Sequence, residues 1–334
     1  MYELLGICLV LAGLLAINAI ASTVAAACAP LLLPALQRRS ARTRAEILFA
    51  LRVGPTALAL LSVTLFLVPS YLGYEPYKTS EIVSKKLAAL AILSMLGVTL
   101  ALWRALRAWL ATRALLQEWL DGAVKIELRG TSIPTFRISN PFPIIAVVGI
   151  VRPRLFIATR VLETLSEEEL IAAIAHEGGH LAGHDNFKRS LLRACRDALM
   201  IVPCGRQLDR AWAEAAECAA DEHAAQQSAA VALNLASALV KIAKMVPVGA
   251  RATVPLAAFL VGVEETRGVK ARVRRLLEIA SHGSRLRVRK PLVARILPAS
   301  TLCGLVLLGV AVASSPRVLV SVHLVIERAV KLLS

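Results

Sequence analysis

Two histidines stand four positions apart in the stretch AIAHEGGHLAGHD, residues 173–185. On an α-helix, His176 and His180 project from one face, so both imidazoles can reach a single metal ion. Glu177 is turned from the first histidine by about 100°, which suits contact with an attacking water rather than with the metal. This H-E-x-x-H spacing is typical of zinc hydrolases in which the glutamate is the general base. A chance His–Glu pair on an ordinary helix is the alternative.

A catalytic zinc site needs a third protein ligand and one open coordination position. The metzincin pattern would place a histidine at Asn186, so that class is excluded. Three imidazoles along one straight helix cannot all reach one ion, so we expect His184 behind a ligand or at the surface. The stretch AECAADEHA offers a better donor, because it places Glu217 and Asp221 one helical turn apart. We expect Glu217 to complete a His₂Glu zinc site and Asp221 to hold a ligand histidine through its other ring nitrogen. A solvated helix face is the alternative for both carboxylates.

The helix that carries the histidines is predicted to begin at Ser166, with Glu169 closing a capping box, and to end near Gly183. A glycine inside a helix costs about 1 kcal/mol relative to alanine, so the pair Gly178–Gly179 needs a reason. We expect packing to be that reason, because glycine lets a neighbouring element approach closely. Gly179 is expected to face the sheet or the second helix, whereas Gly178 is harder to explain.

The surrounding segment combines strands and helices. Brief apolar or alternating runs separated by Gly, Pro and Asn predict four strands, in VKIELRG, TFRIS, IIAVVGI and RLFIA. A second long helix is predicted from about Leu208 to Lys244, since no Pro or Gly interrupts it. A basic helix, EETRGVKARVRRLLEIA, follows. Residues 116–290 are therefore predicted to form one α+β domain that carries the zinc site.

The composition indicates a membrane protein. Hydrophobic residues make up 57% of the 334 residues, and the mean hydropathy is +0.65. Four uncharged runs, at 4–36, 53–74, 87–103 and 296–316, come near the about 20 residues that a spanning helix needs. We expect three transmembrane helices within 1–115, a fourth at 291–316, and a short amphipathic helix outside the membrane at 317–334. Buried core helices are the alternative.

Basic residues near the spans predict the orientation. The loop QRRSARTRAE holds four arginines against one glutamate, and the segment before the fourth run is also strongly basic. The positive-inside rule places both in the cytoplasm, with the two termini outside, as in a bacterial-type inner membrane. Much of the net charge of +16 is then a topology signal. Because the arginines cluster at membrane edges and aromatic residues are scarce, we expect no nucleic-acid partner.

The stretch PFPIIAVVGIVRPRLFIATRVLETLSEEELIAAIAHEGGHLAGHD resembles the membrane metallopeptidases of the BlaR/MecR type. These carry a G-x-x-R-P strand, then H-E-x-x-H-x-x-x-x-D, then a later E-x-x-x-D. The matching positions here are His176, Glu177, His180, Asp185, Glu217 and Asp221. The HtpX and CAAX prenyl protease families share H-E-x-G-H and E-x-x-x-D and remain close alternatives. The resemblance implies a zincin-like (gluzincin) fold with Zn²⁺ as cofactor, and it places Asp185 with Asp221 behind the ligands.

Proteolysis is the activity that the resemblance implies. The expected substrate is a cytoplasmic or membrane-proximal protein, often a transcriptional repressor or the protease itself, cleaved in regulatory signalling. A quality-control protease of the HtpX kind and a catalytically silent zinc-binding adaptor are the alternatives. We expect an extended substrate to add as a strand to the sheet edge at PIIAVVGI, with Val147 as the test position. His223 is the one residue put forward as a donor to the oxyanion.

Overall fold

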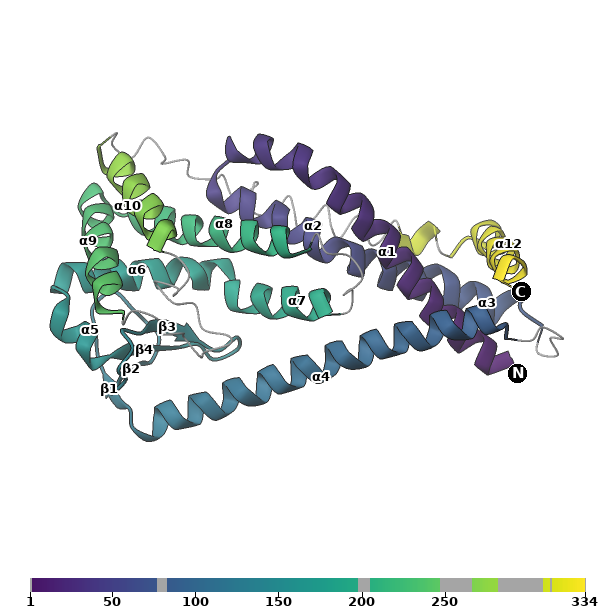
Figure 1. Cartoon of the computed structure of the whole chain (residues 1–334), viewed down its shortest axis with the longest axis horizontal. Coiled ribbons are helices and arrows are strands. Elements are labelled where there is room, and N and C mark those ends of the chain that lie inside the picture. Colours follow the sequence, from purple (N-terminus) through teal and green to yellow (C-terminus); the bar gives the residue numbers. More distant parts are fainter. Residues whose placement is uncertain are drawn as a thin grey trace.

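The computed structural model describes residues 2–76, 83–197, 205–246, 266–281, 309–312 and 314–333. Long helices gather at the end of the molecule that holds both termini, and a small sheet lies at the opposite end (Figure 1). One of these helices, α4 (Lys85–Asp121), runs from the first end to the sheet without a break.

Three helical segments of the described residues are long and apolar enough to cross a membrane. They are α1 (Tyr2–Gln37), the continuous run of α2 (Ala41–Ser62), the π-helix η1 (Val63–Leu67) and α3 (Val68–Tyr74), and α4. Large apolar side chains such as Ile20, Leu60 and Ile92 are exposed on them, as expected where a helix faces lipid. These helices contain the first three predicted spans. The fourth predicted span lies largely outside the described residues.

The helices extend beyond the predicted spans. Ser40 caps α2 by accepting a hydrogen bond from the Thr43 amide, so most of the arginine-rich loop forms the first turns of this helix. At 37 residues α4 is about 55 Å long, far more than a hydrocarbon core of about 30 Å requires. The predicted domain boundary at residues 115 and 116 therefore lies inside a helix.

The sheet contains the four predicted strands: β1 (Val124–Ile126), β2 (Thr135–Ile138), β3 (Ile145–Val148) and β4 (Arg154–Ala158). Their order is β1-β2-β4-β3, with β2 and β4 parallel and the other pairs antiparallel. β3 thus lies at an edge. Gly149 closes the β3–β4 hairpin with φ of 109°, a conformation that favours glycine. Phe156 of β4 is fully buried and packs against Trp119 of α4, which joins the long helix to the sheet.

Helices cover the sheet and continue the domain. They are α5 (Thr159–Thr164), α6 (Glu167–Gly183), α7 (Asp185–Asp197), α8 (Gly205–Ala225), α9 (Ala229–Met245) and α10 (Thr266–Ser281). The predicted capping box of α6 is confirmed, because Ser166 and Glu169 satisfy each other's backbone amides. The single helix predicted from Leu208 to Lys244 is wrong. It breaks at 226–228, where Ser228 caps α9 by accepting from the Val231 amide, so a serine ends the run without Gly or Pro.

The C-terminal helix α12 (Pro316–Leu333) packs against α3 and η1. Ser70 donates a hydrogen bond to the Leu319 carbonyl at 2.8 Å. Ile326 and Val330 join a buried cluster with Leu5 of α1. The predicted amphipathic tail is therefore a helix held by contacts with the candidate spanning helices.

Candidate metal centre

The candidate site lies where α6 and α8 pack closely together. A Cβ atom built on Gly179 would lie 2.7 Å from the Ala220 Cα and 3.1 Å from the His223 Cβ, so only glycine allows this approach. The predicted packing role of Gly179 is thus confirmed, and its neighbour is the second helix. Gly178 has no described atom within 4 Å of its Cβ position, so packing does not explain it.

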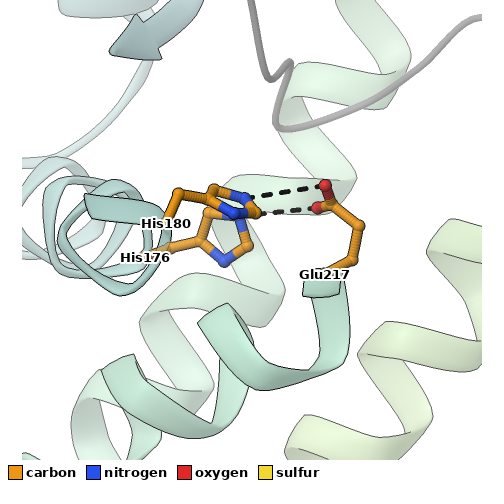
Figure 2. Close-up of side chains that lie close together, drawn as sticks. All are labelled: His176, His180 and Glu217. Carbon is orange, nitrogen blue, oxygen red and sulfur yellow. Dashed lines mark ion pairs between the residues drawn. The ribbon is translucent and has the colours of Figure 1, made fainter. Parts of the chain in front are cut away.

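His176 and His180 of α6 face Glu217 of α8 across this contact (Figure 2). The Nε2 atom of His176 lies 3.6 Å from Glu217 Oε2, and that of His180 lies 3.6 Å from Glu217 Oε1. One donor atom from each of the three residues falls within 4.8 Å of the others. Both imidazoles are almost fully buried. The structure therefore brings together the three residues predicted as metal ligands.

The donor atoms of this cluster fit a metal ion. Neither histidine Nε2 has a hydrogen-bond partner among the described residues, although both are buried. Distances of 3.6 Å to the carboxylate are too long for hydrogen bonds. Buried polar atoms are rarely left unpaired, so their convergence indicates that a cation belongs between them. Two imidazoles with one carboxylate form a donor set that catalytic zinc sites use.

Two aspartates orient the imidazoles from behind. His176 Nδ1 lies 2.9 Å from Asp221 Oδ1, and His180 Nδ1 lies 2.7 Å from Asp185 Oδ2. These contacts fix the rings with Nε2 directed at the cluster. Burial opposes a charge on His180, but Glu217 and Asp185 outweigh it and raise the pKa of His180 to about 10. A cation that binds at Nε2 must therefore displace a proton.

Two arginines outside the predicted set of site residues complete the cluster. Arg272 of α10 donates from Nε and Nη2 to both Asp221 oxygens, at 2.8 and 2.7 Å, and its Nη1 lies 3.1 Å from Glu217 Oε2. Arg189 of α7 donates to Glu217 Oε1 at 3.0 Å. Burial alone would raise the pKa of Asp221, but Arg272 and His176 lower it to about 2. Both carboxylates are therefore held ionised.

A signal for Arg272 was present in the sequence. It shares the apolar stripe of α10 with Val269 and Leu276, at helical spacing, and all three side chains are buried. The basic run was interpreted as a topology signal only. At least one of its charges instead forms a buried ion pair beside the candidate metal ligands.

Glu177 follows His176 on α6, and its side chain contacts β3 rather than Glu217. It is buried, and its Oε2 accepts a hydrogen bond from the Val147 amide of β3 at 3.1 Å. Its Oε1 has no hydrogen-bond partner among the described residues. Burial raises the pKa of Glu177, against the opposing effects of His180, His176 and the Val147 amide. One oxygen is thus anchored while the other is available to exchange a proton.

Two other histidines do not join the cluster. His184 is exposed and ends α6 in the left-handed conformation, with φ of 53°. His223 is exposed, and its Cβ lies against Gly179 at the α6–α8 contact. Its predicted contact with an oxyanion stays a prediction.

The edge of β3 is partly occupied by side chains. The Val147 amide is bonded to Glu177, and the Val147 carbonyl accepts from Asn186 Nδ2 at 2.9 Å. The same nitrogen lies 3.3 Å from the Gly149 carbonyl. A substrate strand that paired with Val147 would have to displace these groups. Proline at Val147 would also release Glu177, so this substitution does not isolate substrate pairing.

The site defines a metallopeptidase-type centre, with two histidines and a glutamate from two helices and a buried glutamate beside them. Residues 146–246 match the model of peptidase family M48. The matched segment runs from β3 through α9 and so includes every candidate ligand. This segment is thus similar to the M48 metallopeptidases, which confirms the predicted resemblance. The comparison with curated proteins finds no match.

Proposed function

We propose that the protein is an integral membrane zinc endopeptidase that hydrolyses a cytoplasmic or membrane-proximal protein in regulatory signalling. The observation that carries this proposal is the convergence of His176, His180 and Glu217 beside the unpartnered oxygen of Glu177. The M48 match over the same residues supports it.

Each residue of the proposed site would have a separate role in the reaction. His176, His180 and Glu217 would hold the metal, and Asp221 and Asp185 would keep the two rings in place. When bound, zinc supplies a Lewis acid that polarises the scissile carbonyl and activates a water near neutral pH. Arg272 and Arg189 keep Glu217 ionised, which favours a divalent cation over a proton at this position.

Glu177 is the general base and acid of the proposed reaction. Its Oε1 takes a proton from the attacking water, and the same carboxyl then delivers that proton to the leaving amine as the C–N bond breaks. The Val147 amide holds Oε2, so the side chain keeps one orientation through both transfers. The raised pKa of Glu177 makes the carboxylate a stronger base toward the attacking water.

A position at the cytoplasmic face of a membrane follows from the proposed orientation. Three helices are long and apolar enough to span a bilayer, and the arginine-rich start of α2 lies beside the metal-site helices. With that end in the cytoplasm, the site works within reach of polypeptides that emerge from the membrane. The bilayer and a protein substrate are the proposed partners.

The test compares wild-type protein with the Glu177→Gln variant in membranes. We expect the variant to keep its zinc, measured by atomic emission on purified protein, and to lose proteolysis. Quantitative proteomics should then show one or a few proteins that accumulate as full-length species. Accumulation of many unrelated membrane proteins would instead indicate quality control. Unchanged processing together with retained zinc would contradict an enzymatic role and favour the adaptor.

A further inference from the structure

The first turns of α2 pack against α8 and contact the end of α6 through Arg42; these are the two helices that carry the candidate metal ligands. Along this stretch, from Ala41 to Arg52, α2 packs beside α8, next to α1 (Figure 1). α2 is at the same time the start of the second candidate span. One element therefore belongs both to the membrane helices and to the surroundings of the metal centre.

Polar contacts fix α8 to α2 on either side of Glu217. Toward the N-terminus of α8, Asp209 accepts a hydrogen bond from Arg52 Nε at 3.0 Å, and the Arg52 side chain is buried. Toward the C-terminus, Glu222 Oε2 accepts from the Ala41 amide at 3.3 Å. The two helices are thus antiparallel, and Glu217 lies between the two attachment points. Sliding α8 along α2 would break both contacts.

Close apolar packing fills the space between these attachments. Ala45 and Leu48 of α2 form a buried cluster with Trp212, Ala215 and Ala216 of α8. Small side chains on both helices leave little freedom for a change in their separation. The position of α8 relative to α2 is therefore fixed along the helix axis and perpendicular to it.

The histidine helix is held by the same part of α2. Arg42 Nη2 donates to the Ala182 carbonyl at 3.1 Å, which satisfies a free carbonyl in the last turn of α6. α7 provides a second set of contacts between α2 and the metal centre. Lys188 pairs with Glu46 of α2 at 2.6 Å, and the next residue, Arg189, pairs with Glu217.

We propose that Arg42 and Arg52 are positioning residues of the peptidase. They hold α6 and α8 in the register that brings Glu217 to the two histidines, so the metal centre is complete only when α2 is in place. This inference rests on the proposed zinc site. A candidate membrane span is then part of the catalytic machinery as well as an anchor. α2 is the element that connects the membrane helices to the helix that carries Glu217.

The test uses the full-length protein in detergent or nanodiscs. Arg52→Gln and Arg42→Gln are compared with Arg38→Gln, which removes the same charge from an exposed position just before α2. Zinc affinity is measured by competition with a chelator. Thermal unfolding is measured on zinc-free protein, and kcat and KM are measured on zinc-saturated protein. We expect zinc affinity to fall roughly tenfold or more in both test variants, as when groups that orient metal ligands are removed. The control should stay within about twofold, a change too small to reflect lost positioning.

Two further results separate positioning from folding. The exchange Arg52→Asp with Asp209→Arg should restore much of the zinc affinity that Arg52→Gln loses, because it remakes the pair in reverse. For zinc-saturated Arg42→Gln we expect kcat to fall while KM stays near the wild-type value. Lower thermal stability with unchanged zinc affinity and kcat would overturn the inference. Wild-type protein that binds no zinc would overturn the proposed function itself, which is a different outcome.

Discussion

The two adjacent glycines of the histidine helix should respond in opposite ways to alanine. Gly178→Ala adds a methyl group where no described atom lies within 4 Å, so its main effect is the better helix propensity of alanine. We expect it to stabilise the protein by about 0.5–1 kcal/mol. Gly179→Ala adds the same methyl group at 2.7 Å from the Ala220 Cα.

The size of the second effect follows from this contact. Ordinary van der Waals contact begins at 3.4 Å, so α8 must move outward by about 0.7 Å. The obstacle is a backbone atom, so no change of rotamer relieves it. Overpacking of this kind costs about 1–3 kcal/mol, which exceeds the gain in helix propensity. Glu217 lies one turn from Ala220 and would move with it, whereas metal–ligand distances tolerate only about 0.2 Å. We therefore expect zinc affinity to fall roughly 10- to 100-fold.

Both variants can be measured with the same two assays. Thermal unfolding of zinc-free protein gives the direction of the stability change, and chelator competition gives zinc affinity. Gly178→Ala serves as the matched control, because it makes the same substitution one position away. If Gly179→Ala bound zinc as tightly as wild type, or if both variants lost affinity equally, the proposed close packing of α6 on α8 would be refuted.

Three other substitutions test separate parts of the site. Arg272→Gln removes the partner of buried Asp221, so we expect zinc affinity to fall roughly 10- to 100-fold in chelator competition; unchanged affinity would contradict the role given to this pair. Asn186→Ala frees the Val147 and Gly149 carbonyls that a substrate strand would otherwise have to uncover, so KM for an extended peptide should fall while zinc affinity holds, and an unchanged KM would speak against substrate binding there. Burial raises the pKa of Glu169, but hydrogen bonds from Lys241 and other donors lower it overall, so its stabilising effect is present above its ordinary pKa of 4.5 and is lost as pH falls through the lower folded value. The Glu169→Gln variant should have a free energy of unfolding about 1 kcal/mol lower than that of wild type at pH 7, and it should lose less stability in acid. If the stability of variant and wild type depended on pH in the same way, this contribution of Glu169 would be excluded.

The features that depend on near neighbours in the chain can be predicted from the amino-acid sequence. Helical periodicity fixes the common face of His176 and His180, and a serine with a glutamate three residues later fixes the start of α6. Uncharged runs of sufficient length give the first three candidate spans, and short apolar runs between turn residues give the four strands. Each of these signals acts over a few residues or one helix.

Contacts between residues far apart in the chain depend on how the whole chain folds. The composition does not show where α8 ends. The break depends on α9, which turns back so that its apolar face is buried against α6, and a serine is enough to cap the start of α9. Arg272 acts on Asp221 from 51 residues away, and Arg52 acts on Asp209 from 157 residues away. Helical spacing indicates at most that such an arginine is buried and not which residue it pairs with, since the partner is set by the fold, where each buried charge needs a neighbour of opposite sign to offset its lost hydration. The ligands and the two aspartates behind the histidines were therefore visible in the sequence, while the arginines that pair with the carboxylates and with α8 were not.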